Sequence, residues 1–292
     1  YVAKAGRCRT ALMRLRIATC RPLPEPDVDE SLLNDALSAA GIEPIMCAWD
    51  DPAAWTSAVP TLVRSTWDYI HRLDAFRDWI KHVGRAAPLW NPAIVIRENL
   101  HKRYLLLLAS RGVSIVPTVL VERGDRRAFR DLARPLEATQ LVIKPAVGAG
   151  SFETHRVISD SVETPSLWER LVSERDMLIQ PYLSAVESHG ERALVWIDGE
   201  FTHAVRKSPR FAADVEQVSD ALPISDAERT LGEAALAPWR SMLLYARVDV
   251  APGTDGRPVV MELELVEPSL FLKQSPDALS RLVSGVRRRL VA

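Results

Sequence analysis

The chain contains few cysteines and no long apolar run. Its 292 residues include three cysteines, Cys8, Cys20 and Cys47, which form no CxxC pair and cannot all pair with one another. Such sparing use indicates a reducing compartment. The sequence has no apolar stretch of about 18 residues, no leader with a cleavage site and no N-x-S/T acceptor. We therefore expect a cytoplasmic protein that does not interact with membranes.

The chain also lacks an excess of positive charge. Lysine and arginine total 37 against 38 aspartate and glutamate residues, a formal net charge of −1. A nucleic-acid-binding protein needs a basic footprint, so this balance argues against a nucleic-acid partner. The basic segment 286–290 is expected at the C-terminal end of a last helix, where cations complement the helix dipole.

Several catalytic motifs are missing as well. The sequence contains no GxxxxGK[S/T] loop, no HExxH, no GxSxG and no GxGxxG after the first predicted strand. The six histidines are scattered without the spacing of metal ligands. A zinc site or a serine-hydrolase triad is therefore not expected.

The hydrophobic pattern of the first third predicts a small parallel sheet with flanking helices. The order is strand, helix, strand, strand, helix, and each helix is followed by a glycine in the manner of a helix end. Ligands of such sheets bind beyond the carboxyl ends of the strands. Those ends are the segments 21–27 and 65–69. The predicted strands are 15–20, 42–49 and 61–67, and the predicted helices are 32–40 and 72–84, closed by Gly41 and Gly84, while residues 1–12 lack periodicity and are left out.

The remainder of the chain predicts a second, larger unit that begins with a helical segment, 96–112. Asp198-Gly199 is a strong signal for a two-residue hairpin turn. Ser225 and Glu228 form the pattern of a capping box, and Ser275-Pro276 opens a final helix. The predicted strands include 116–121, 141–145, 151–158, 177–183, 245–250 and 258–265.

Three carboxylates are predicted to meet on two paired strands. Side chains two apart on a strand share one face, so Glu262 and Glu264 stand together, and Asp249 lies on the preceding strand. Neighbouring carboxylates resist joint ionisation, which predicts a cation between them. Oxygen ligands without histidine or cysteine favour Mg²⁺, Mn²⁺ or Ca²⁺. The alternative is a solvated strand face, but the intervening residues, such as Leu263, are of the core type.

A lysine and a small-residue turn follow another apolar strand. Lys144 lies near the end of the strand 141–145, and the glycines after it would let backbone N–H groups approach phosphate oxygens. An ordinary β-turn explains these glycines equally well. Lone lysines are usually solvated, so the remaining cations are weaker candidates. The turn contains Gly148, Gly150 and Ser151, and the weaker candidates are Lys102, Arg206 and Lys207.

The order of these pieces resembles the ATP-grasp superfamily over residues 96–275. It runs from a helical lysine through a strand lysine with its small-residue loop and a Gln-Pro-Tyr-Leu strand end to Arg-x-Asp and Glu-x-Glu. The resemblance implies an α/β (α+β) ATP-grasp fold. It comprises a pre-ATP-grasp domain with a small parallel sheet at 13–95 and an ATP-grasp domain at 96–292. The latter would contain a nucleotide-covering subdomain, 115–182, and a metal and substrate subdomain, 183–292.

The resemblance also implies a role for each site residue, with ATP and one or two Mg²⁺ ions, or Mn²⁺, as cofactors. One departure is that Glu264 stands where many members carry asparagine, which leaves Glu267 as an alternative to Glu262. The implied set is Lys102 and Lys144 for the phosphates, Gly148, Gly150 and Ser151 for the covering loop, Gln180, Pro181, Tyr182 and Leu183 for the adenine, Glu187 or the competing Glu191 for the ribose, and Asp249, Glu262 and Glu264 for the metal.

Members of this superfamily activate a carboxylate as an acylphosphate with ATP, and a nitrogen nucleophile then releases phosphate. ARVDV, ELELVEPSLFL and VRSTWDY are most similar to the O-ureidoserine cyclo-ligases of D-cycloserine biosynthesis. These enzymes close one small amino-acid-like substrate on itself, with loss of carbon dioxide and ammonia. Arg206, Lys207 and Arg247 are then candidates for contacts to phosphate or the substrate carboxylate. The segment 208–224, with Arg210, is a candidate lid that would exclude water.

Two other functions remain open on the sequence. An intermolecular carboxylate–amine ligase would use the same residues with a different pocket between 21–30 and 65–69. A nucleotide sensor would bind ATP without turnover, although three carboxylates and two lysines argue against it. Related folds often dimerise, so a homo-oligomer is expected too.

Overall fold

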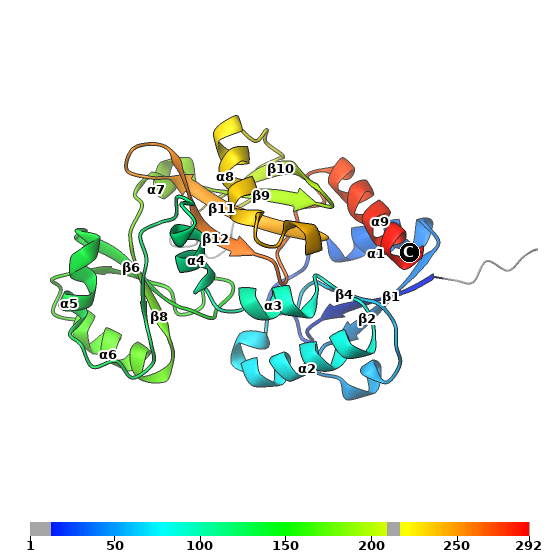
Figure 1. Ribbon diagram of the computed structural model, residues 1–292, viewed down its shortest axis with the longest axis horizontal. Coiled ribbons are helices and arrows are strands. Elements are labelled where there is room, and N and C mark those ends of the chain that lie inside the picture. Colours follow the sequence, from blue (N-terminus) through cyan, green and yellow to red (C-terminus); the bar gives the residue numbers. More distant parts are fainter. Residues whose placement is uncertain (1–12, 209–216, 292) are drawn as a thin grey trace, which may run out of the picture.

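The computed structural model describes residues 13–208 and 217–291, which form three four-stranded sheets (Figure 1). The parallel sheet of the N-terminal unit lies on one side, an antiparallel sheet with two helices lies on the other, and a second antiparallel sheet lies between and above them. This mixed α/β architecture confirms the predicted fold class.

The first sheet is parallel, with the strand order β2-β1-β3-β4. Its central strand β1 is buried from Leu15 onward, and α1 packs against β2. The predicted third strand ends early, at Val63, because the chain leaves the sheet there. The elements are β1 (Met13–Thr19), α1 (Glu30–Ala39), β2 (Ile42–Ala48), η1 (Pro52–Trp55), β3 (Thr61–Val63), η2 (Tyr69–His71), α2 (Leu73–Ala86) and β4 (Leu89–Trp90).

The two glycines predicted to end helices behave differently. Gly41 follows α1 with a φ of +77°, the left-handed conformation expected after a helix end. Gly84 lies inside α2, so the prediction that it ends this helix was wrong. A Cβ atom at Gly84 would lie 2.9 Å from the Cβ of Ala93, so the glycine instead allows α2 and α3 (Ala93–Asn99) to pack closely.

The segment predicted as one helix over 96–112 is two helices, α3 and α4 (Tyr104–Ser110). The break between them contains Lys102, whose backbone N–H donates to the carbonyl of Ala146 at 2.7 Å. The side chain of Asn99, at the end of α3, bonds the backbone of Leu263 and Leu265. These long-range contacts explain why a strongly helical sequence is interrupted here.

The second sheet is antiparallel, with the strand order β5-β8-β6-β7. Alternation along β6 sends Leu141 and Ile143 to a buried core with the two helices, where the rings of Phe129 and Trp168 lie 5.4 Å apart. Lys144 points to the opposite face. The elements are β5 (Val119–Val121), α5 (Phe129–Ala133), η3 (Arg134–Leu136), β6 (Gln140–Pro145), β7 (His155–Ile158), α6 (Thr164–Glu174) and β8 (Met177–Pro181).

The third sheet is antiparallel, with the strand order β10-β9-β11-β12. The predicted hairpin turn at Asp198-Gly199 and the capping box of Ser225 and Glu228 are both confirmed. The elements are α7 (Ala185–His189), β9 (Glu191–Ile197), β10 (Glu200–Lys207), α8 (Asp226–Leu236), η5 (Arg240–Met242), β11 (Tyr245–Pro252), β12 (Pro258–Glu264) and α9 (Pro276–Val291).

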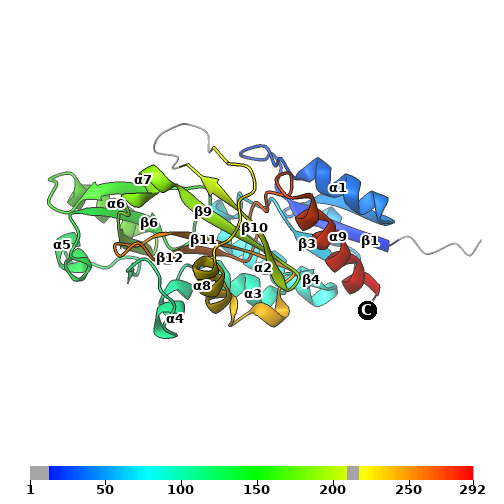
Figure 2. The same ribbon diagram turned by 90° about the horizontal axis from the view of Figure 1, so that it is seen from above.

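The last helix, α9, packs beside α1 of the N-terminal unit (Figure 2). Leu15 and Leu37 of that unit share one hydrophobic cluster with Tyr245 and Leu282. The core therefore continues across the predicted division near residue 95, and the domain boundaries themselves stay a prediction.

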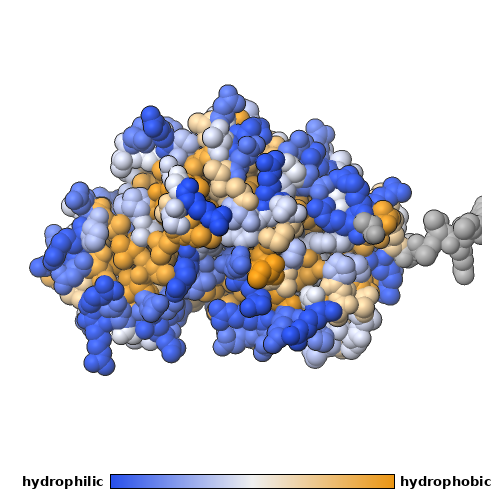
Figure 3. All heavy atoms as spheres, viewed as in Figure 1, coloured by the Kyte–Doolittle hydropathy of each residue, from blue (hydrophilic) through white to orange (hydrophobic). Residues whose placement is uncertain are grey.

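The face shown in Figure 3 is hydrophilic along most of its outline, with a notch in its lower edge between the part that carries β6 and β8 and the part that carries α2 and α3. Within the ranges 13–208 and 217–291, none of the helices combines the length and apolar character that a membrane span requires. Cys20 and Cys47 are both buried free thiols.

Candidate active site

A cavity of about 740 Å³ opens where the three sheets meet. The segments 22–25 and 67–71 line one end, which confirms that the ends of β1 and β3 face a ligand-sized space. The end of β8 lines another part of the cavity, and β11 and β12 contribute the acidic face. The loop 148–154 also lines the cavity and reaches the segment 67–71 through Phe152 and His71. The volume is in the range of ordinary small-molecule sites.

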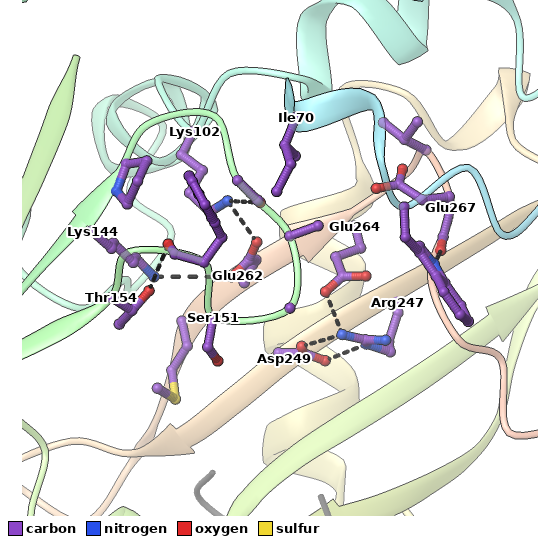
Figure 4. A pocket seen from close by; sticks show the side chains of 18 of the residues that line it. Ile70, Lys102, Lys144, Ser151, Thr154, Arg247, Asp249, Glu262, Glu264 and Glu267 are labelled. Carbon is purple, nitrogen blue, oxygen red and sulfur yellow. Dashed lines mark hydrogen bonds and ion pairs between the residues drawn. The ribbon is translucent and has the colours of Figure 1, made fainter. Parts of the chain in front are cut away.

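Four charged side chains share one face of the β11–β12 pair. The antiparallel register places Asp249 opposite Glu262 and Arg247 opposite Glu264. The residues between them on each strand, such as Val248, point into the hydrophobic core. The prediction that Glu262 and Glu264 stand on one face with Asp249 nearby is therefore confirmed, and Figure 4 shows them together.

Glu262 lies between two lysines. Its carboxylate is 3.0 Å from the Nζ atom of Lys102 and 3.9 Å from that of Lys144. Lys102 also donates to the carbonyl of Gly148 at 2.7 Å, which connects the acidic face to the glycine loop (Figure 4). Burial alone would raise the pKa of Glu262, but the two lysines hold that pKa below its usual range. Burial lowers the pKa of Lys144.

Asp249 is held by two cations. The guanidinium of Arg247 donates two hydrogen bonds of 2.8 Å to its carboxylate, and Nζ of Lys207 lies 2.9 Å away. Although burial opposes it, these cations keep the pKa of Asp249 well below its usual range. Lys207 also pairs with Glu191 and Arg247 with Glu264. Burial raises the pKa of both glutamates to about 7.

The predicted metal ligands Asp249, Glu262 and Glu264 therefore all carry protein cations as partners. Among the residues with described positions, no three acidic, histidine or cysteine side chains are grouped closely enough to hold a metal. The chemistry of the set still fits a hard cation such as Mg²⁺, because every donor is a carboxylate oxygen. For a metal to bind, Lys102, Lys144, Lys207 and Arg247 would have to give up some of their contacts with these carboxylates.

The predicted adenine segment, 180–183, lies at one end of the cavity. The N–H of Tyr182 donates to the carbonyl of Gln140 and is therefore used within the sheet. In an antiparallel strand, adjacent residues direct their backbone groups to opposite sides. The carbonyl of Pro181 consequently faces away from β6, and Leu183 follows the end of the strand.

Two predicted site residues lie outside the cavity. Glu187 is exposed, and its carboxylate binds Arg156 at 2.7 Å and the hydroxyl of Tyr182 at 2.9 Å. Arg206 is also exposed, contrary to the prediction that it contacts the site, because alternation along β10 turns Lys207 inward and Arg206 outward. Glu191, the competing choice for the ribose, lines the cavity.

The glycine loop lies over the cavity between the lysines and the N-terminal unit. Gly148, Gly150 and Ser151 all line the cavity, and the ring of Phe152 meets that of His71 edge-on at 5.2 Å. Of the predicted lid 208–224, residues 209–216 with Arg210 lie outside the described residues. The part that follows pairs with β10 through the bridges Ala204–Leu222 and Lys207–Val218.

Side chains from the N-terminal unit and the segment after β12 complete the site. Sequence reasoning assigned no role to Trp67 or Tyr69, and it named Glu267 only as an alternative metal ligand. Trp67 Nε1 donates to the backbone carbonyl of Glu267 at 3.1 Å, and Tyr69 lies close enough to its carboxylate to lower the pKa of that group. Burial raises the pKa of Glu267 to about 8. For Trp67 and Tyr69, the sequence signal was VRSTWDY, which begins at the last residue of β3.

Comparisons with known proteins agree with this architecture. The family described as the N-terminal domain of D-cycloserine synthetase DcsG matches residues 15–91. The cycloserine biosynthesis protein DcsG of Streptomyces lavendulae is 32% identical over 286 residues, which cover 90% of this chain and 94% of that protein. The crystal structure of D-cycloserine synthetase DcsG is similar with a TM-score of 0.85 and 29% identity, over 95% of this chain and 99% of that chain.

More distant structures share the fold. D-alanine–D-alanine ligase from Bacillus anthracis has a TM-score of 0.66 at 19% identity, over 96% of this chain and 97% of that chain. The ATP-grasp ligase PsnB, complexed with its minimal precursor, Mg and ADP, has a TM-score of 0.64 at 17% identity, over 95% and 98% of the two chains. These similarities confirm the ATP-grasp fold, and the identity to DcsG shows that the chain belongs to the DcsG family of ATP-grasp ligases.

Proposed function

We propose that the protein activates the carboxylate of O-ureido-D-serine as an acylphosphate and closes it onto a nitrogen of the same molecule. The products would be D-cycloserine, ADP and phosphate, and one water molecule would be consumed as the carbamoyl group leaves as carbon dioxide and ammonia. The observation that carries this proposal is the 32% identity to the cycloserine biosynthesis protein over nearly the whole chain. The cavity supports it, because one continuous space joins a cation-rich part to a small end between the segments 22–25 and 67–71.

ATP would occupy the part of the cavity lined by the second and third sheets. We infer that Lys102 and Lys144 contact its phosphates, because both ammonium groups converge on the acidic face. The glycine loop would cover the phosphates with backbone N–H groups. The carbonyl of Pro181 and the N–H of Leu183 are the groups proposed for the adenine, and Glu191 is preferred to Glu187 for the ribose because it lines the cavity.

Asp249, Glu262 and Glu264 would hold one or two Mg²⁺ ions, or Mn²⁺. Bound there, the metal supplies stabilisation of the negative charge on the transferring phosphoryl group. When phosphate oxygens arrive, the lysines that now neutralise Glu262 gain a second set of anionic partners. This exchange would free carboxylate oxygens for the metal.

Arg247 and Lys207 would orient the substrate carboxylate for attack on the phosphate. A guanidinium offers paired N–H groups that match a carboxylate, and Arg247 already makes this geometry with Asp249. Both cations are buried, which makes their electrostatic effect on developing charge stronger than in water. The enclosed site would also protect the acylphosphate from hydrolysis.

A cytoplasmic location and a homo-oligomer stay expectations from the sequence.

The test is ADP release by the purified protein with Mg-ATP, with and without O-ureido-D-serine, together with the mass of the organic product. ADP that forms only with this one compound, and a cyclised product, would support the intramolecular reaction. ADP release that needs a second amino compound would replace it by the intermolecular carboxylate–amine ligase. ATP binding without turnover under either condition would favour a sensor.

A further inference from the structure

Glu267 lies at the end of the cavity that the N-terminal unit closes. It lies in the segment that follows β12, whose last residue is Glu264. Glu267 lines the cavity together with Trp67 and Tyr69. In Figure 4, Lys102 and Lys144 lie on one side of the view and Glu267 on the other. Glu267 thus lies at the end proposed for the substrate. It forms an ion pair with neither Lys102 nor Lys144, although the charge of Lys102 acts on its carboxylate.

The position of Glu267 is set by contacts from the segment that follows β3. Arg64 donates to the carbonyl of Pro268 at 2.9 Å, and Trp67 donates to the carbonyl of Glu267 itself. Tyr69, which is 4% exposed, lies close enough to the carboxylate to lower its pKa against the effect of burial. The contacts of Arg64 and Trp67 fix the backbone at Glu267, so the carboxylate projects from a defined position, which a recognition group requires.

The charge environment of Glu267 differs from that of the other acids described in the cavity. Asp68, at the same end, has Arg72 as a partner at 2.6 Å. Among residues 13–208 and 217–291, no lysine, arginine or histidine lies within ion-pair distance of Glu267, which is 8% exposed. The cation partners of the acids at the metal face are Lys102 for Glu262, Arg247 for Glu264 and Asp249, and Lys207 for Asp249 and Glu191.

A buried carboxylate is normally paired with a cation, because removing its charge from water costs free energy. The raised pKa of Glu267 reflects that cost, to which nearby Glu264 adds. A ligand that brings a positive charge to this end of the cavity would supply the missing partner. An amino acid has the required polarity, since its carboxylate would face Arg247 while its ammonium faces Glu267.

We propose that Glu267 binds the α-ammonium group of the substrate and makes the site specific for an amino acid rather than a simple carboxylic acid. This inference rests on the proposed function, because it takes the activated group to be the carboxylate beside that ammonium. Tyr69 and Trp67 are positioning residues for Glu267. The alternative is that Glu267 serves only as a neutral partner of Tyr69.

The test compares the wild-type protein with Glu267→Gln, which keeps a polar partner for Tyr69 but removes the charge. Binding is measured by calorimetry with Mg²⁺ and a non-hydrolysable ATP analogue present. The ligands are O-ureido-D-serine and 3-(ureidooxy)propanoate, which lacks the α-amino group. A second pair, D-serine and 3-hydroxypropanoate, tests the same group without the ureido part. Glu163→Gln, an exposed glutamate outside the site, is the matched control.

We expect the wild type and the control to prefer the amino compound of each pair by about 10- to 100-fold, the range of a charge-assisted hydrogen bond. Glu267→Gln should reduce this preference to about one while leaving the affinity for the ATP analogue unchanged. That unchanged affinity also shows that the variant is folded. An unaltered preference in the variant, or no preference in the wild type, overturns the inference.

The two proposals fail in different ways. If O-ureido-D-serine is turned over but the preference does not depend on Glu267, the proposed reaction stands and this inference is wrong. If the preference depends on Glu267 but O-ureido-D-serine is not turned over, the inference is supported and the substrate of the proposed reaction is another amino acid.

Discussion

Lys102 and Glu262 form an ion pair of 3.0 Å between the break that separates α3 from α4 and the edge strand β12. The same ammonium group donates to the carbonyl of Gly148 in the glycine loop. One side chain therefore joins the acidic face to the loop proposed to cover the phosphates. A nucleotide that displaces Lys102 from Glu262 or from Gly148 would therefore affect both the acidic face and the glycine loop.

Replacing Glu262 by glutamine should abolish most turnover. The change removes a proposed metal ligand and leaves Lys102 and Lys144 without their shared carboxylate. Metal stabilisation of the transferring phosphoryl group is worth several kcal/mol, so we expect a loss of more than about 100-fold in kcat. ADP release at varied Mg²⁺ concentration measures both the rate and the Mg²⁺ requirement, with Glu163→Gln as control. An unchanged Mg²⁺ dependence would move the metal site to Glu264 and Glu267.

Replacing Lys144 by methionine should raise the KM for ATP and lower kcat, each by about 10- to 100-fold, as expected for the loss of a charge-assisted contact. Methionine keeps much of the apolar length of the side chain, so packing on β6 should survive. Steady-state kinetics with varied ATP and saturating O-ureido-D-serine measures both parameters. Lys81→Met on the exposed side of α2 is the control. Parameters equal to those of the control would remove Lys144 from the phosphate site.

Replacing Asn99 by alanine should destabilise the protein. Its side chain donates to the carbonyl of Leu263 at 2.9 Å and accepts from the N–H of Leu265 at 2.7 Å, on either side of Glu264. Two buried backbone groups would lose their partners, at about 2–4 kcal/mol in total. With about 2–4 °C per kcal/mol, thermal denaturation should show a clear fall in Tm.

The control for that experiment is Asn34→Ala. The Oδ1 atom of Asn34 is buried without a hydrogen-bond partner among the residues placed in the structure. Its removal should therefore change Tm little. Equal losses at Asn34 and Asn99 would show that the bridge to β12 contributes no specific stability.

The stability of the ligand-free protein should fall as pH rises from about 5 to about 8. The pKa of Glu267 is about 8 in the folded protein against 4.5 ordinarily, so within this window the folded state holds a proton that the unfolded chain has released. Burial is the main cause. The groups that also act on Glu267 are Glu264, Tyr69, Lys102 and Glu262.

Chemical denaturation of the wild type and Glu267→Gln at pH 5.5 and pH 8 isolates this contribution. As pH rises, the free energy of unfolding should fall more in the wild type than in the variant, because glutamine does not titrate. Glu191 and Glu264 act in the same direction in both proteins, since burial raises their pKa to about 7. A difference between the two proteins that stays constant with pH would contradict the assigned environment of Glu267.

Much of the fold followed from local patterns. The alternation in MELEL placed Glu262 and Glu264 on one face of a strand, and Asp198-Gly199 specified a hairpin turn, because both depend on residues adjacent in the chain. The helix break at Lys102 could not be predicted from local patterns, because the segment is apolar and helical in character. Its interruption depends on contacts with Ala146 and β12 that are distant in sequence.

By itself, the sequence determined the order of strands and helices, the acidic pair on one strand face and the motif order of an ATP-grasp ligase. Period-two alternation also requires that one of Arg206 and Lys207 point inward, but only the packing of β10 decided that it is Lys207. Tertiary structure alone paired each acid of the metal face with a cation and left Glu267 beside Tyr69 at the substrate end. The reason is physical: local backbone geometry fixes which side chains share a face, whereas charge pairing depends on the distances between faces that meet only in the folded chain.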